Sequence, residues 1–227
     1  MLGLVTQMSE PVKTPRRYHS PRRAAQARET RRRVLDAAAR LFQDQGYPRT
    51  TIAEVAAAAD IASDTVLHLF GSKRGLLKEV MDVVVGGDDQ DVAVLERADP
   101  QAARREKDQH VQIAMFAAGI TEQLERIRPM DDILRSAAAV DGEAAALRDS
   151  LQLDQRRAAM RTVAGWIAAN GPLRTDAGAP DPVEATAAIL WTLTSPEVHQ
   201  MLREHWGWTP ATYERWLRST LESSLLP

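Results

Sequence analysis

Four residues near the expected starts of two helices have the chemistry to hold a phosphate. They are Thr50, Thr51, Ser72 and Lys73. Hydroxyl groups, ammonium groups and the free N–H groups of a helix N-terminus all donate hydrogen bonds that phosphate oxygens accept. Lys73 also places a cation in the first turn of a helix, against the helix dipole, and this favours a nearby anion. The pattern indicates a surface that contacts the backbone of a nucleic acid.

Between these two helix starts lies a predicted pair of short helices, at residues 52–59 and 63–70. Thr51 and Glu54 have the capping-box spacing that opens the first helix, and residues 60–62 form the turn. These are the dimensions of a helix-turn-helix, whose second helix enters the major groove of DNA. The inward face of that second helix carries Val66, Leu69 and Phe70. Its outward face, the predicted DNA-reading face, carries Ser63, Asp64, Thr65, Leu67 and His68.

Other chemistries lack the residues that they require. The sequence has no Cys, which excludes disulfide scaffolds, thiolate zinc sites, iron–sulfur clusters and Cys nucleophiles. Its five His include no pair at i, i+4, and no HExxH, GxSxG, phosphate-binding Gly loop or calcium-loop spacing occurs. We therefore expect no catalytic residue, no metal and no cofactor. An all-α enzyme or an interaction module that does not bind DNA is the competing interpretation.

Charge is uneven along the chain, although the formal net charge is only -2. Residues 1–33 carry nine basic and two acidic groups, whereas the remaining 194 residues carry 20 basic and 29 acidic groups. A basic end on an acidic body is typical of a protein that binds a polyanion. Residues 1–23 contain three Pro and no apolar period, which predicts a flexible basic arm. This arm either contacts DNA or is a tail without a role.

Helical periodicity dominates from Ala24 onward, so the expected fold class is all-α. A helix over about 24–45 ends at Gly46, the two short helices follow, and Ser72 caps a fourth helix. Residues 86–91 (GGDDQD) read as a linker. Beyond the linker we expect three longer helices, near 101–127, from Pro129 to about 140, and over 143–169. Asn170-Gly171-Pro172 is the stop signal of the third. Three more helices are expected to begin at Pro182, Pro196 and Pro210.

Residues 31–80 combine these features in one order without gaps. They contain an Ala/Leu-Phe helix, Gly46-Tyr47, the Thr50-Thr51 pair before an Ile/Val-Ala helix, and the close Phe70-Gly-Ser-Lys-Arg-Gly-Leu-Leu. This run closely resembles the TetR family of transcriptional regulators. A weaker likeness to the C-terminal end of some TetR-family regulatory domains covers 191–199 and 207–217.

The resemblance implies a homodimer whose helix-turn-helix heads bind a pseudo-palindromic operator in double-stranded DNA. It also implies a C-terminal helical bundle that binds a small molecule, which then releases the DNA. The chain would consist of the arm (1–23), a DNA-binding head (24–86) and a ligand-binding and dimerisation body (87–227). The predicted function is therefore a ligand-released repressor. A transcriptional activator or a ligand-independent DNA-binding protein is the alternative.

Three positions of the helix-turn-helix depart from the family pattern. Asp60 stands where the family usually has Gly in a left-handed turn, a conformation that Asp tolerates at some cost. Ala62 replaces the Ser that normally caps the second helix, so we expect Ser63 to cap it one residue later. Leu67 replaces an aromatic residue, and its apolar side chain could contact a thymine methyl group.

In the body, an effector pocket would be lined mostly by apolar and aromatic groups. The candidates are His110, Phe116, Met160, Trp166 and Trp191, although core packing is the alternative role for each. Helices near 182–194 and 210–222 are the expected dimer face. No stretch approaches the roughly 18 apolar residues of a membrane span, and no signal-like apolar segment occurs near the N-terminus. We therefore expect a cytoplasmic protein without a membrane partner.

Overall fold

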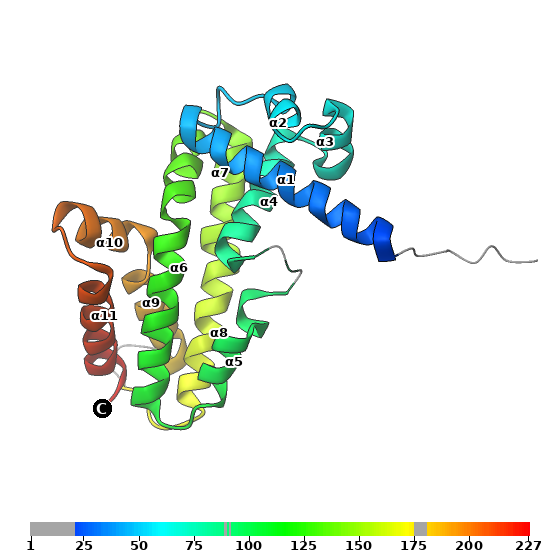
Figure 1. The fold of residues 1–227 in the computed structure, drawn as a ribbon. Coiled ribbons are helices and arrows are strands. Elements are labelled where there is room, and N and C mark those ends of the chain that lie inside the picture. The colour runs from blue at the N-terminus through cyan, green and yellow to red at the C-terminus, as the bar shows by residue number, and fades with distance from the viewer. Residues whose placement is uncertain (1–20, 89, 91, 175–180) are drawn as a thin grey trace, which may run out of the picture.

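The computed structural model describes residues 21–88, 90, 92–174 and 181–227, and the regular elements in these ranges are all helical (Figure 1). Four helices form the head: α1 (Pro21–Gln45), α2 (Ile52–Ala58), α3 (Ser63–Phe70) and α4 (Lys73–Gly86). The body contains η1 (Val94–Glu96), α5 (Ala98–Arg105), α6 (Gln109–Ala138), α7 (Gly142–Asp149), η2 (Ser150–Arg156), α8 (Arg157–Ala168), α9 (Pro182–Leu193), α10 (Pro196–Gln200), η3 (Met201–His205) and α11 (Pro210–Leu225). The all-α fold class is confirmed.

Side-chain caps define most of the helix starts that the sequence predicted. Thr51 and Glu54 form the complete capping box of α2. The Ser72 hydroxyl accepts a hydrogen bond from the Gly75 amide at the start of α4. The helices that begin at Pro182, Pro196 and Pro210 are capped in turn by Asp181, Ser195 and Thr209. Each of these starts is confirmed.

Pro129 does not begin a helix, and this prediction was wrong. It lies inside α6, which runs without a break from Gln109 to Ala138. An interior Pro costs about 3 kcal/mol because it removes one backbone hydrogen bond. Apolar residues on both sides of it are buried, Leu124 in the body core and Met130 and Leu134 in the head core. Packing of both halves therefore outweighs the local cost.

Other boundaries shift by smaller amounts. The helix expected over 101–127 is divided because α5 ends at Arg105 and the Asp108 carboxylate caps a new start, accepting from the amides of His110 and Val111. The helix expected over 143–169 is one continuous rod whose central part, η2, is π-helical. Helix α8 ends at Ala168, next to the expected end at residue 169, so this end is confirmed. Helix α1 begins at Pro21, so the last three residues of the predicted arm are helical, and the rest of the arm, residues 1–20, lies outside the described residues.

Two apolar cores stabilise the molecule, and α6 contributes to both. The head core joins residues of α1–α4 to Met130, Leu134 and Ala137 of α6 and Ala144 of α7. The body core joins the first half of α6 to α8, α9 and α11. In Figure 1 the head lies at one end of the molecule and α6 extends from it down the length of the body. Helix α4 ends at Gly86, whereas residues of α6 and α7 pack into the head core, so the domain division expected at residue 86 stays a prediction.

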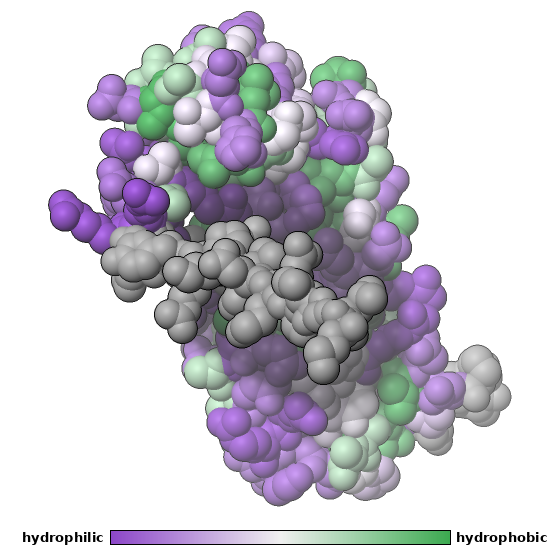
Figure 2. Space-filling model, turned by 90° about the vertical axis from the view of Figure 1, so that its right-hand side faces the viewer, coloured by the Kyte–Doolittle hydropathy of each residue, from purple (hydrophilic) through white to green (hydrophobic). Residues whose placement is uncertain are grey.

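On the side of the molecule shown in Figure 2, hydrophilic residues predominate and hydrophobic residues occur in separate patches. Within the described ranges, no helix is both long and apolar enough to cross a membrane.

Candidate nucleic-acid interface

Helix α3 is held by its inward face and presents the opposite face to solvent. Val66 and Phe70 are buried in the head core together with Val55 and Ala56 of α2. Of the five residues on the predicted DNA-reading face, Ser63 is half-buried and the others, Asp64, Thr65, Leu67 and His68, are exposed. The structure thus brings these five side chains together on one exposed helix surface.

The turn between α2 and α3 follows the expected geometry at Asp60 and departs from it at Ser63. Asp60 has φ 54°, the left-handed conformation, and is the one non-Gly residue with positive φ in the described part of the chain. Ser63 does not cap α3, contrary to our expectation. It is the first helical residue, and the cap is Ala62, whose side chain makes no capping hydrogen bond.

Leu67 is unusual among the residues of this face because it is large and apolar. Its exposed fraction is 43%, so close to half of its surface has no protein neighbour. It is surrounded along α3 by small polar side chains. In a major groove, such a side chain could contact the C5-methyl group of thymine.

Two of the four predicted phosphate contacts lie at the surface. Thr51 is exposed, and its hydroxyl donates to Glu54 Oε2 at 2.9 Å. Hydrogen bonds from the Thr51 backbone amide and then from its hydroxyl hold the pKa of Glu54 below its usual value. Ser72 is exposed, and its oxygen accepts from the Gly75 amide at 3.0 Å. The Ser72 hydroxyl can therefore still donate to a phosphate.

Thr50 and Lys73 are instead occupied inside the head. Thr50 is fully buried, and its hydroxyl donates to the carbonyl oxygens of Gly46 at 2.9 Å and Leu41 at 3.2 Å. Lys73 Nζ donates to the carbonyl oxygens of Tyr47 at 2.9 Å, Thr50 at 3.0 Å and Pro48 at 3.4 Å. It also lies 4.3 Å from the centroid of the Tyr47 ring. A phosphate contact from either residue would require these bonds to open.

Arginines form the basic part of this surface, and sequence reasoning missed one of them. Arg49 is exposed in the turn just before α2, and its place beside Thr50-Thr51 was the signal that could have found it. Arg31 is not a free cation, because it pairs with Glu79 of α4 and lies over the Phe70 ring. Exposed arginines on α1 are Arg22, Arg23, Arg28, Arg32, Arg33 and Arg40.

A groove of about 210 Å³ separates part of α1 from the end of α2, between Arg33, Arg40 and Asp60.

None of the five candidate effector residues lines the cavity between α6 and α10 or the groove beside α1. His110 is exposed, with Nδ1 3.8 Å from Glu222 Oε1 of α11. Trp166 lies beneath the Arg104 guanidinium, and Phe116 is half-buried in the body core. The Thr194 hydroxyl lies 3.8 Å from Met160 Sδ, and Arg156 donates both to that hydroxyl and to the Trp191 carbonyl oxygen. Phe116, Met160, Trp166 and Trp191 all belong to or pack against the body core.

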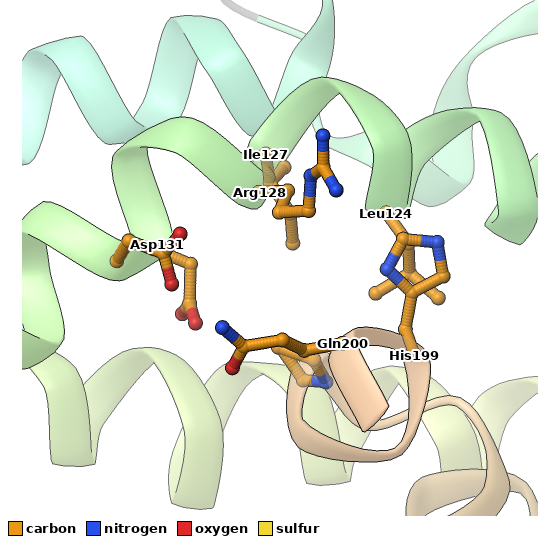
Figure 3. A pocket seen from close by; sticks show the side chains of 8 residues that line it. Leu124, Ile127, Arg128, Asp131, His199 and Gln200 are labelled. Carbon is orange, nitrogen blue, oxygen red and sulfur yellow. The ribbon is translucent and has the colours of Figure 1, made fainter. Parts of the chain in front are cut away.

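A small cavity between α6 and α10 has a different lining. Figure 3 shows Asp131 of α6 and Gln200 of α10 extending toward the same space from opposite sides. The cavity volume is about 10 Å³, which is the minimum for one water molecule. Asp131 is 4% exposed and has no hydrogen-bond partner for its carboxylate among the described residues, and its pKa is raised mainly by burial.

His199 borders this cavity and belongs to a buried polar cluster. Its Nε2 lies 2.9 Å from Glu125 Oε1, and Glu125 also pairs with Arg203. The Arg203 guanidinium lowers the pKa of Glu125, whereas burial lowers the pKa of His199. No group of three His, Asp or Glu suited to a metal ion occurs among the described residues. This cluster therefore reads as a polar contact between α6 and α10.

Comparison with known proteins gives the strongest sequence match at the head. Residues 34–80 match the family model for bacterial regulatory proteins of the tetR family. The HTH-type transcriptional regulator BetI of Burkholderia cenocepacia (strain HI2424) is 46% identical over 55 residues, which are 24% of this chain and 28% of BetI. The match thus spans little more than a quarter of the length of that relative and is confined to one region.

Solved structures extend the likeness to the body at the level of fold. NalD, the secondary repressor of the MexAB-OprM multidrug efflux pump in Pseudomonas aeruginosa, is 18% identical with a TM-score of 0.63, over 89% of this chain and 98% of NalD. A Saccharomonospora viridis protein in complex with choline is 15% identical with a TM-score of 0.60, over 88% of this chain and 99% of that protein.

The head thus matches the family model for bacterial regulatory proteins of the tetR family in sequence, and most of the chain shares the fold of these solved structures.

Proposed function

We propose that this protein is a transcriptional repressor that binds operator DNA as a homodimer and is released when a small molecule binds the body. The observation that carries the proposal is α3, a rigidly seated helix with an exposed, mostly polar face inside the region that matches the tetR model. Its dimensions and its position after α2 suit insertion into a major groove. A chromosomal operator would place its action in the cytoplasm, and we propose no enzymatic activity.

Affinity and sequence choice would come from different elements. Helix α3 carries no Lys or Arg and one acidic residue, Asp64. Contacts to phosphates would therefore come from Arg49, Thr51, Ser72 and the exposed arginines of α1. Phosphate contacts fix the register of a protein on DNA, whereas base contacts select the sequence. Base choice would rest on the side chains of α3.

Release by an effector requires that the effector favour an arrangement of the heads that does not fit the operator. By linkage, the operator then weakens effector binding by the same factor. Continuity of the head core with α6 and α7 supports such coupling, because a shift of α6 moves side chains inside the head. NalD is named a repressor, and the Saccharomonospora viridis protein holds a small molecule in the same fold.

We further propose that α9 and α11, which occupy the stretches expected at the dimer face, join two copies. Two-fold symmetry would then place the two α3 helices about one DNA turn apart or a multiple of it, on a pseudo-palindrome.

A mobility-shift experiment with genomic fragments tests the proposal. We expect a subset of fragments to be retained at about 150 mM salt in the presence of excess unrelated DNA, with affinity falling steeply as salt rises. Light scattering on the same preparation should give about twice 25.1 kDa. A monomer that retains no fragment in a salt-dependent manner would refute it.

A further inference from the structure

Arg156, the last residue of η2, has a guanidinium group without a counter-ion. Its Nη2 donates to the Trp191 carbonyl oxygen and, at 2.9 Å, to the Thr194 hydroxyl. Its Nη1 is buried and has no hydrogen-bond partner among the residues that the structure describes. Within the described ranges, no carboxylate lies within 4.0 Å of this group to form an ion pair. The Arg156 residue as a whole is half-buried, and removal of an unpaired charge from water is unfavourable, so such groups are rare in proteins.

Glu197, Tyr213 and Asp131 act on Arg156 only through space, because they raise its pKa without pairing with it among the described residues. Glu197 pairs with Arg148 at 2.6 Å. Burial raises the pKa of Asp131, which favours its neutral form. The Tyr213 hydroxyl donates to the Leu193 carbonyl oxygen, and burial raises its pKa as well. Burial lowers the pKa of Arg156 to about 10, which still leaves the guanidinium charged at neutral pH.

A purely structural role accounts for one edge of the guanidinium. Trp191 and Thr194 lie at the C-terminal end of α9, where a cation interacts favourably with the helix dipole. That role uses Nη2 alone. The two N–H groups of Nη1 remain without an acceptor, and an anion placed there would satisfy both the hydrogen bonds and the charge.

The surroundings of Arg156 suit the apolar part of a ligand. The centroid of the Trp191 ring lies 5.3 Å from Arg156 Cζ, and Trp191 itself is half-buried. Thr194, which accepts from Arg156, also contacts the buried Met160. Trp191 and Met160 are two of the residues that the sequence suggested for an effector site. The π-helical geometry of η2 is itself a feature that recurs at functional sites.

We propose that Arg156 is the recognition point for the effector, and that the effector is a carboxylate with an aromatic or alkyl body. This inference rests on the proposed ligand-released function. Neither cavity described above is lined by Arg156, so ligand entry must open the space around Trp191. Binding would then favour a conformation other than this one, as release from an operator requires.

Two matched sets of small probes test the charge requirement with the full-length protein. The first set is benzoate, benzyl alcohol and benzylammonium, and the second is octanoate, 1-octanol and octylammonium. Binding is followed by Trp fluorescence and by the shift of the melting temperature. In at least one set we expect the carboxylate to bind roughly tenfold or more tightly than the matching alcohol and ammonium compound. A difference of this size corresponds to the loss of one charge-assisted hydrogen bond.

Substitutions assign that preference to Arg156. Arg156→Met should weaken carboxylate binding roughly 10- to 100-fold, to the level of the alcohol. Arg157→Met removes the same charge from the neighbouring exposed residue and should leave the preference intact. Arg156→Gln keeps an amide donor for the Trp191 carbonyl oxygen and removes the charge. It replaces the Met variant in the titrations if circular dichroism shows that the Met variant is unfolded.

Absence of a carboxylate preference in both sets would overturn the inference, as would a preference that survives both Arg156 substitutions. Mobility shifts with the same preparations separate this failure from that of the proposed function. Retained DNA fragments without a carboxylate preference would refute the effector chemistry alone. A protein that retains no fragment would refute the repressor proposal, while the titrations would still decide whether Arg156 binds an anion.

Discussion

Lys73 has the residue type and the position of a phosphate contact, and in the structure its ammonium group closes the head instead. Three carbonyl oxygens from the turn before α2 surround Nζ, and the Tyr47 ring lies beneath it. The first turn of α4 is thereby tied to the segment that leads into α2. The ammonium group of Lys73 is therefore stabilised by backbone carbonyl oxygens, and it does not need an anion at the first turn of α4.

Lys73→Met should therefore lower stability and leave electrostatic DNA binding nearly unchanged. Loss of hydrogen bonds from a charged donor predicts about 2 kcal/mol less free energy of unfolding. Chemical denaturation measures this loss, and the salt dependence of operator binding should keep its slope. Lys78→Met is the matched control, because Lys78 makes an exposed pair with Asp82, which contributes about 1 kcal/mol or less. A slope reduced by about 1 at unchanged stability would instead assign Lys73 to a phosphate.

Leu67 offers a direct probe of base reading, because deoxyuridine differs from thymidine only by the methyl group. In an operator selected from genomic fragments, replacement of the contacted thymine by uracil should weaken binding by about 1 kcal/mol, or fivefold. The Leu67→Ala protein should show no such loss. Equal effects of the replacement on both proteins, or an operator without thymine in its half-sites, would remove Leu67 from base recognition.

Asp131 should make stability depend on pH. Burial raises its pKa in the folded protein above the unfolded value, with Glu197 adding to the rise and Arg135 opposing it. Stability from the protonated carboxyl is thus fully present below about pH 4, the unfolded pKa, and is lost as pH rises through the folded pKa. Asp131→Asn cannot ionise, so its free energy of unfolding should fall less over that window. Parallel pH curves for the two proteins would contradict this.

Local sequence was enough to predict which residues form the outward face of α3. It could not predict the hydrogen-bond and charge partners of residues outside that helix. The spacing of Val66 and Phe70 sets the inward face, so the opposite face follows from helical geometry alone. Thr50 and Lys73 meet carbonyl groups contributed by the turn, and those contacts exist only after folding. Arg156 and Asp131 likewise become notable through what fails to pair with them. Sequence gives their types and not their surroundings.

At the scale of elements, side chains of α6 cap the end of α4. Arg126 donates to the carbonyl oxygens of Val84 at 2.9 Å and Val85 at 3.2 Å, and Gln123 donates to Val85 at 3.0 Å. These are the carbonyl groups that a helix leaves unpaired at its C-terminus. Gly87, which follows with φ 86°, lies against the Arg126 guanidinium. The connection between head and body is thus held at its last helical turn.

Arg126→Ala should weaken communication between effector and operator. We expect the ratio of operator dissociation constants with and without saturating effector to fall several-fold toward 1, because coupling of this kind amounts to about 1–3 kcal/mol in total. Arg128→Ala is the control on the same helix, since Arg128 pairs with Glu204 of η3 and, among the described residues, forms no hydrogen bond or ion pair with α4. An unchanged ratio in the Arg126 variant would exclude this cap from the coupling.

The starts of helices could be predicted because the capping residues are neighbours in sequence. Whether a helix continues through a proline could not be predicted, because that depends on packing against distant segments. Asp181, Ser195 and Thr209 each precede a Pro and announce a helix in sequence. Pro129 carries the same signal without such a cap and lies inside α6. Burial of Leu124 on one side and Met130 on the other decides the outcome, and both depend on distant segments.

At the scale of the whole molecule, the near-neutral chain separates a basic surface from an acidic body. The exposed arginines of α1 and Arg49 supply the positive charge, whereas α3 supplies none. Electrostatic attraction would thus bring the head to any duplex, and the face of α3 would choose among sequences. Specific and non-specific binding should respond to different substitutions.

The most direct test combines salt and a variant of α3. Binding of a selected operator and of an unrelated duplex is measured from about 50 to 300 mM salt for the wild type and for Thr65→Ala/Leu67→Ala/His68→Ala. These three side chains are exposed, so the variant should melt at the wild-type temperature. We expect the variant to bind both duplexes with the weak, salt-dependent affinity that the wild type shows for the unrelated one. A variant that still prefers the operator as strongly as the wild type, or a wild type that binds neither duplex, would contradict it.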